Sequence, residues 1–91
     1  MESIITDDLE HCYICGRPYP QMHHMMNKFH KAKSEQYGLM IPLCINHHTG
    51  NEGVHRQTKR MLEMRQLAQR KFVEKYSLEL WMKEFGKDYQ P

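Results

Sequence analysis

The chain has 91 residues, a net charge of +2 and 40% hydrophobic residues, which predict a single small domain with a thin core. It contains no apolar run close to the roughly 18 residues of a membrane span, which excludes a transmembrane helix in this sequence. Residues 1–10 carry four acidic side chains and no basic one, the opposite of a secretory signal. We therefore expect a cytoplasmic protein with reduced thiols.

The first half of the chain is expected to form two short strands around a turn. Leu9–Ile14 is expected to begin a strand, and Gly16 allows a tight turn directly after it. Two prolines in Arg17–Pro20 exclude a helix interior and favour the turn of a hairpin. Residues 21–26 then return as a strand, and residues 27–37 form a loop or short helix ending at Gly38.

The second half is expected to be mainly helical. Apolar residues recur at helical spacing between Val54 and Tyr76, with basic residues on the opposite face. Ser77 is the expected N-cap of a last helix, whose apolar residues either close the core or bind a second copy. The expected elements are a strand at 39–43, a short helix beginning at 44–48, a long basic helix at 54–76, and a short C-terminal helix and tail at 77–91.

Cysteine and histidine pairs with metal-ligand spacing bracket the two strands. Cys12 and Cys15 form one pair, and Cys44 and His47 form the other. Two intervening residues let a tight turn, or knuckle, place both side chains on one metal ion. Three thiolates and one imidazole are a common structural zinc set, although His48 could replace His47. Knuckle, hairpin and second knuckle opening a helix predict an α+β domain of the treble-clef type.

Histidines beyond this zinc set require a further explanation. His23, His24, His48 and His55 remain once zinc has taken its four ligands. Adjacent residues of a strand point to opposite faces, so His23 and His24 are unsuited to binding the same ion. We expect one of them to bind a second, divalent metal and the other to act as a general base near neutral pH.

The whole pattern, Cys-x-x-Cys, His-His, Pro-Leu-Cys-x-x-His-His and a further His, resembles the HNH, or ββα-metal, endonucleases. It is similar to small phage-type members, among them the RecA-dependent nucleases that enhance recombination. The resemblance covers about residues 9–60 of a single domain at 1–91, with a β-hairpin and helix as the ββα-metal core. It implies a phage or prophage protein in a bacterial host cell that acts on DNA, with a recombinase filament as a further expected partner.

The resemblance also implies a role for each surplus histidine. His24 matches the general base that activates water for phosphodiester hydrolysis. His23, His48 and His55 match ligands of one catalytic ion, which is magnesium, manganese or zinc. His48 and His55 are seven residues apart, which on an unbroken helix is about 10 Å of rise. We therefore predict that Gly50 and Gly53 interrupt the helix, because a continuous one would exclude His55.

Two other functions remain open, and one departure from the family pattern favours the second of them. Residues 36–39 contain no asparagine where the motif has the one that orients the base, so another group must hold His24. The first alternative is a non-catalytic zinc-binding adaptor that contacts DNA or protein. The second is a recombination accessory that keeps an HNH-like scaffold without turnover.

Basic residues flank the expected site and predict contacts with DNA. Phosphate contacts of this kind provide affinity without sequence choice, and nothing in the chain resembles a helix aimed at base edges. The candidates are Lys28, Lys31, Lys33, Arg56, Lys59 and Arg60.

Overall fold

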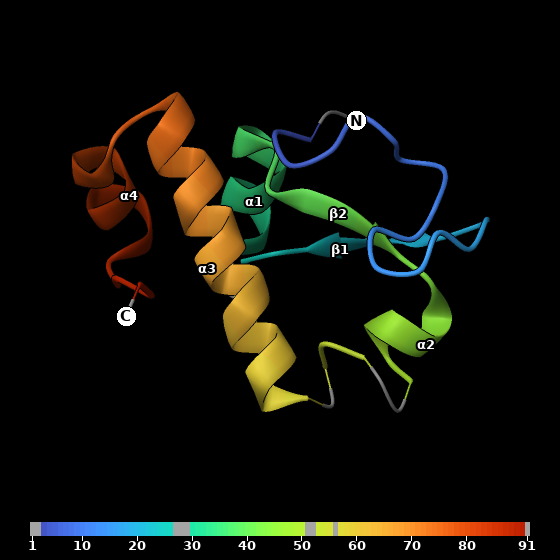
Figure 1. The fold of residues 1–91 in the computed structure, drawn as a ribbon. Helices are drawn as coiled ribbons and strands as arrows, with labels where there is room; N and C mark the ends of the chain where they lie inside the picture. The colour runs from blue at the N-terminus through green and yellow to red at the C-terminus, as the bar shows by residue number, and fades with distance from the viewer. Residues whose placement is uncertain (1–2, 27–29, 51–52, 56, 91) are drawn as a thin grey trace.

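The computed structural model describes residues 3–26, 30–50, 53–55 and 57–90. Within these residues the predicted α+β class is confirmed: two short strands alternate with helices (Figure 1). None of the helices described is long and apolar enough to cross a membrane. The elements in chain order are β1 (Gln21–His24), α1 (Lys31–Tyr37), β2 (Met40–Leu43), α2 (Ile45–His48), α3 (Thr58–Lys75) and α4 (Leu78–Phe85).

The two strands pair antiparallel, and β1 carries two of the candidate site residues, His23 and His24. His23 lies opposite Ile41 and His24 opposite Met40. All four β2 residues are buried, as an apolar strand with one face on the core and the other under neighbouring segments requires. The pair places β1 histidines next to α2, which follows β2 directly.

The N-terminal segment differs from the prediction. The strand expected at Leu9–Ile14 is reduced to a single bridge between His11 and Pro18. The hairpin turn expected at Arg17–Pro20 lies earlier, because the Cys12 N–H already donates to the Arg17 carbonyl at 2.8 Å. The knuckle itself is therefore the turn, and its closing residue, Gly16, has a φ of 78° that a glycine adopts without strain.

Helix ends follow the predicted signals except at the start of α3. Gly38 ends α1 with a φ of 71°, and the Ser77 side chain accepts the Leu80 N–H at the start of α4. The long helix begins at Thr58 rather than Val54, and it ends at Lys75. The predicted interruption after α2 is confirmed, because residues 53–55 form a turn between the two helices.

The core lies between α3, the strand pair and α4 (Figure 1). Phe72 of α3 contacts both Trp81 and Phe85 of α4, with ring centroids 5.4 and 5.8 Å apart. Trp81 is fully buried, and its Nε1–H donates to the Lys87 carbonyl at 2.8 Å. Trp81 and Phe85 of the last helix therefore close the core, whereas Leu78 at its start is 47% exposed.

Candidate metal centres

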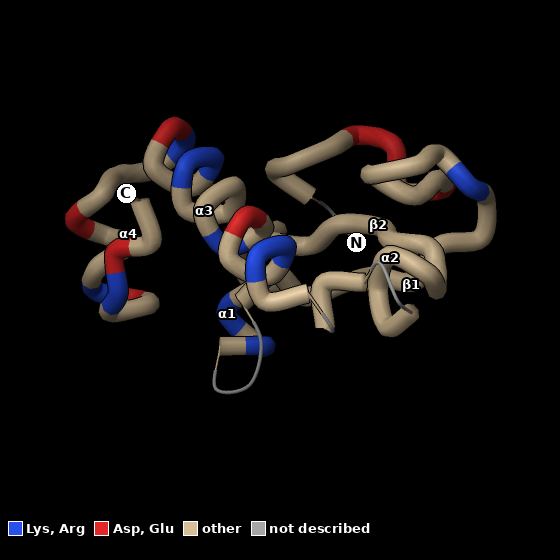
Figure 2. The backbone as a smooth tube through the Cα atoms, turned by 60° about the horizontal axis from the view of Figure 1, so that its bottom comes forward, with Lys and Arg blue, Asp and Glu red and all other residues tan. Residues whose placement is uncertain are grey.

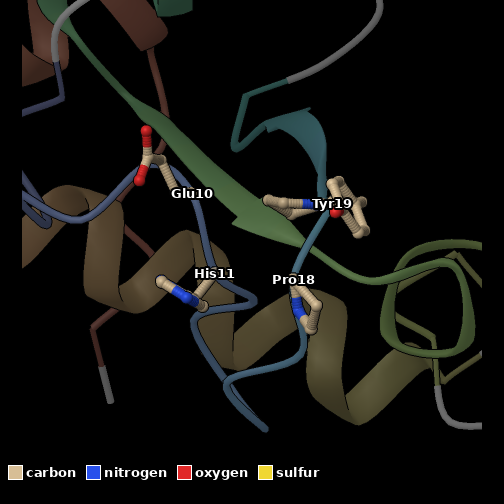
Figure 3. A pocket seen from close by; sticks show the side chains of 5 residues that line it. Glu10, His11, Pro18 and Tyr19 are labelled. Carbon is tan, nitrogen blue, oxygen red and sulfur yellow. The ribbon is translucent and has the colours of Figure 1, made fainter.

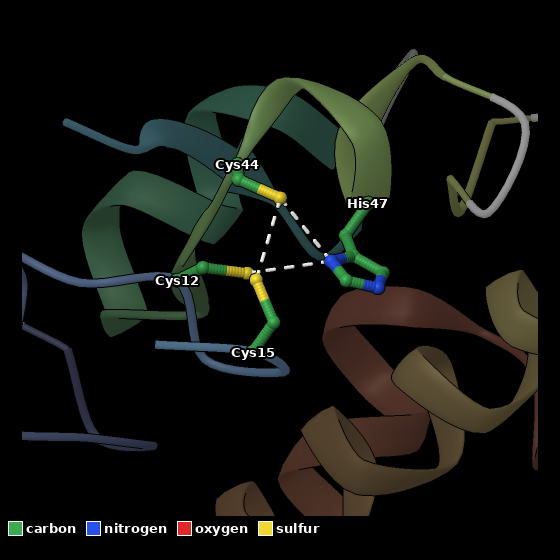
Figure 4. A group of neighbouring side chains, drawn as sticks. All are labelled: Cys12, Cys15, Cys44 and His47. Atoms are coloured by element: carbon green, nitrogen blue, oxygen red, sulfur yellow. Dashed lines mark hydrogen bonds between the residues drawn. The ribbon is translucent and has the colours of Figure 1, made fainter. Parts of the chain in front are cut away.

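The two knuckles bring four metal-ligating side chains to one point (Figure 4). Cys44 Sγ lies 3.2 Å from His47 Nδ1 and 3.6 Å from Cys15 Sγ, and Cys12 Sγ lies 3.7 Å from His47 Nδ1. A tetrahedron with metal–sulfur distances of about 2.3 Å has edges of about 3.8 Å. The four side chains therefore fit a structural zinc ion, with His47 rather than His48 as the fourth ligand.

The electrostatics of this Cys3His cluster also call for a cation. Burial opposes ionisation of Cys12, but backbone N–H groups from both knuckles outweigh it and lower the pKa of its thiol to about 6. A backbone N–H from Arg17 favours the Cys15 thiolate, yet burial and the neighbouring sulfurs raise the pKa of Cys15. Thiols that cannot all ionise together without a positive charge between them are typical of a zinc site.

Three further histidines converge beside this cluster. They come from β1, from the end of α2 and from the turn before α3, and one nitrogen of each lies within 4.8 Å of the others. The Nε2 atoms of His48 and His55 are 3.1 Å apart. The ring of His23 has its centroid 5.3 Å from that of His48 and 5.2 Å from that of His55. The structure thus brings together the three residues predicted to bind a second ion.

The chain after α2 folds back onto the end of that helix, and this brings His55 to His48. The Val54 N–H donates to the His47 carbonyl at 3.0 Å, and the His55 N–H donates to the His48 carbonyl at 3.2 Å. A Cβ at Gly53 would lie 2.7 Å from the His48 carbonyl oxygen, closer than packing allows. Only glycine therefore permits this close approach.

A side chain that the sequence reading missed fixes the ring of His48. His48 Nδ1 lies 2.8 Å from the Gln21 amide oxygen, so Nδ1–H donates and Nε2 carries the free lone pair. Gln21 shares the face of His23 on β1 because the two are two residues apart, and that period is the signal that could have found it. Such outer partners commonly orient the histidine ligands of metals.

His23 is the most deeply buried of the three histidines. It is 1% exposed, and its Nε2 atom has no hydrogen-bond partner among the described residues. Burial, helped by the neighbouring His48 and His55, lowers the pKa of His23 to about 3, so the ring is neutral at physiological pH. Burial also lowers the pKa of His48. Imidazole nitrogens that converge in this way fit a metal ion, and three ligands leave a coordination position open.

The predicted base, His24, stands apart from these three rings but opens onto the same hollow. Its Nε2 lies 2.9 Å from a carboxylate oxygen of Glu35 on α1. The hollow has a volume of about 330 Å³, and its lining combines the four histidines with one lysine. The lining residues are Met22, His23, His24, Lys31, His48 and His55.

The basic residues predicted to contact DNA differ in how exposed they are and in how close they lie to the histidine hollow. Lys31 is exposed and lines the histidine hollow, and Lys59 is exposed in the first turn of α3. Lys33 instead donates to the Glu84 carbonyl at 2.7 Å and pairs with the Glu84 carboxylate at 3.6 Å, which ties α1 to α4. Figure 2 shows basic residues recurring along α3, with acidic residues interspersed along α3 and around α4. Arg60 is partly buried, and Lys28 and Arg56 lie outside the described residues.

A larger hollow of about 440 Å³ lies beside the first knuckle (Figure 3). Its lining includes Glu10, His11 and Tyr19, and the His11 ring is already paired with Asp8 at 2.9 Å. Metal-ligating atoms do not converge there among the described residues. The smaller, histidine-lined hollow is therefore the better candidate for chemistry.

Comparison with protein-family models, with curated proteins and with solved structures finds no match to this chain. The likeness to HNH nucleases accordingly rests on the motif residues themselves. At the level of the fold, the chain is a small α+β domain with an antiparallel strand pair, helices and a Cys3His cluster that could bind zinc.

Proposed function

We propose that this protein is a metal-dependent DNA endonuclease or nickase of the HNH type. The observation that carries the proposal is the buried Nε2 of His23, which has no hydrogen-bond partner in the described part of the chain and lies beside the converging nitrogens of His48 and His55. A buried polar atom without a partner costs about 1–3 kcal/mol, and a bound ion removes that cost. The neighbouring His24 gives the same hollow a group able to take a proton.

The donor set favours zinc or another transition metal over magnesium in the catalytic position. Imidazole nitrogens suit zinc and related ions, whereas magnesium prefers oxygen ligands. His23, His48 and His55 would hold the ion. Its positive charge would stabilise the negative charge on the scissile phosphate and on the leaving oxygen.

The remaining chemistry belongs to side chains of this chain. His24 takes one proton from a water molecule, whose oxygen forms the new bond to phosphorus. The ester bond between phosphorus and the leaving oxygen breaks, and that oxygen takes a proton from solvent. Lys31, exposed at the rim of the hollow, provides a cation for the DNA phosphate.

Nicking of supercoiled plasmid tests the proposal. Wild-type protein would be incubated with zinc, manganese or magnesium, both with and without a recombinase filament on the DNA. His24→Ala should lower the cleavage rate about 10²–10⁴-fold because the proton acceptor is lost, while the fold and bound zinc persist. His11→Ala, an exposed histidine paired with Asp8 outside the hollow, is the matched control and should cut normally. Absence of cutting in every condition, or equal cutting by the His24 variant, would end the proposal.

A non-catalytic adaptor or recombination accessory is the second candidate. It is favoured by the direct contact between His48 and His55, which can satisfy each other without an ion. This alternative predicts one metal ion per chain and DNA binding without cleavage. Native mass spectrometry of zinc-loaded protein separates the two, because the nuclease proposal requires a second ion.

A further inference from the structure

Glu35 is the one acidic side chain that contacts the proposed base among the described residues. Its Oε1 atom lies 2.9 Å from His24 Nε2, and the two side chains are 54% and 19% exposed. Glu35 lies one helical turn after Lys31, which lines the hollow. Residues four apart share one face of a helix, so α1 presents both charged groups toward the same region.

The rest of α1 is anchored in a way that fixes the position of this carboxylate. The Ser34 hydroxyl is buried and hydrogen-bonds the backbone N–H and carbonyl of Met26, just beyond β1. The Leu39 N–H donates to the Ser34 carbonyl at 2.8 Å, where the chain enters β2. Lys33 ties the same helix to α4 through Glu84. Glu35 therefore projects from a helix held on three sides, which restricts where its carboxylate can lie.

The contact determines which nitrogen of His24 can act. A carboxylate only accepts hydrogen bonds, so the neutral ring must carry its proton on Nε2 and keep Nδ1 as the basic atom. The same contact limits rotation of the ring, which keeps the acceptor aimed at one place.

We propose that Glu35 is the positioning residue of His24 and takes the place of the asparagine that the family pattern has and this chain lacks. The proposal rests on the nuclease function and deepens it. Glu35 touches neither substrate nor metal; it acts only through the ring of His24. The assignment explains how the hollow can contain an oriented base although residues 36–39 offer no asparagine.

Two substitutions and a control test the role of Glu35 in plasmid nicking. Glu35→Ala removes both the acceptor and the charge and should lower kcat about 10²-fold while KM changes less than two-fold. Glu35→Gln keeps an acceptor oxygen without the charge and should lower kcat about ten-fold. Gln36→Ala, the next exposed position on α1, should match wild type. A loss confined to KM, or full activity of Glu35→Ala, overturns the proposal.

A second measurement does not depend on activity. Nitrogen-15 chemical shifts of the His24 ring report which nitrogen carries the proton, and wild type should show the Nε2–H tautomer. Glu35→Ala should show a mixture of tautomers, with the zinc content and melting temperature unchanged; an unchanged Nε2–H tautomer overturns the proposal. Wild type that cuts no DNA would instead overturn the nuclease function, so the two failures are distinguishable.

Discussion

The two candidate metal centres of this small domain are built in opposite ways. The Cys3His cluster draws its four ligands from two knuckles, and within each knuckle the ligands are three positions apart in the sequence. The histidine cluster draws one ligand from each of three segments and opens into a hollow. A closed tetrahedral set holds a fold together, whereas three ligands with an open position allow chemistry.

The difference also predicts how the two centres respond to damage. Losing a zinc ligand removes the cross-link between the N-terminal segment and the start of α2, whereas losing the histidine cluster leaves the core of α3 and α4 intact. The first centre should therefore control stability and the second should control activity.

The largest effect is expected for Cys44→Ser. Structural zinc contributes roughly 10–16 kcal/mol in zinc-finger peptides, more than the 5–15 kcal/mol that typically stabilises a whole domain. Loss of one of its ligands should therefore abolish cooperative thermal unfolding followed by circular dichroism and release the zinc. His48→Ala is the matched comparison and should keep both the zinc and the unfolding transition. A Cys44→Ser protein that melts like wild type would show that the Cys3His cluster does not stabilise the fold.

Gly53→Ala should weaken the histidine cluster and leave the Cys3His cluster intact, because Gly53 belongs to neither set of ligands. The new methyl group would lie 2.7 Å from the His48 carbonyl oxygen, so the turn must move and His55 must leave His48. We expect a loss of about 2–3 kcal/mol of stability and at least ten-fold weaker binding of the second ion, measured by unfolding and by calorimetric zinc titration.

Gly86→Ala is the control for this experiment. A Cβ at Gly86 meets nothing within 4 Å, and its φ of 73° makes backbone strain the main cost. It should lower stability by about 1 kcal/mol and leave both metal ions in place. Equal affinity for the second ion in Gly53→Ala and Gly86→Ala would show that the fold-back does not build the histidine cluster.

Sequence reasoning worked where the deciding interactions are local. The spacing within each knuckle predicted the four residues that converge in the Cys3His cluster, and Gly38 and Ser77 marked helix ends because each acts through its own backbone conformation or a neighbour three residues away. The predicted start of the long helix was wrong because the backbone N–H groups of Val54 and His55 donate hydrogen bonds to α2 and hold both residues in a turn. No helical pattern in the sequence contains that information.

Which histidine each partner contacts could not be predicted from the sequence, for a related reason. Gln21 meets His48 across 27 positions, and Glu35 meets His24 across 11, in each case between different elements. Such contacts depend on strand register and on how α1 and α2 pack against β1. The missing asparagine showed that some group had to hold His24, but only the packing of α1 identifies it.

Gln21→Ala should weaken the second centre and spare the first. Losing the acceptor for His48 Nδ1–H frees the ring to rotate or change tautomer, which typically costs 10–100-fold in metal affinity. Gln21→Glu keeps an acceptor oxygen and should retain most of the affinity. Calorimetric titration of the second ion distinguishes the variants, with retained structural zinc as the internal control. Unchanged affinity in Gln21→Ala would mean that His48 does not depend on this contact.

The smallest expected effect concerns the DNA surface. Lys31→Ala should weaken DNA binding a few-fold and reduce the slope of affinity against salt by about 1, because one phosphate contact is lost. Lys33→Ala removes a lysine from the same helix whose charge is engaged by Glu84, so it should leave the slope unchanged and lower stability by at most about 1 kcal/mol. Fluorescence anisotropy in the His24→Ala background measures binding without cleavage. Equal changes in slope for both lysines would place DNA along the whole of α1, whereas a change for Lys31 alone places it over the histidine hollow and thus over the open centre.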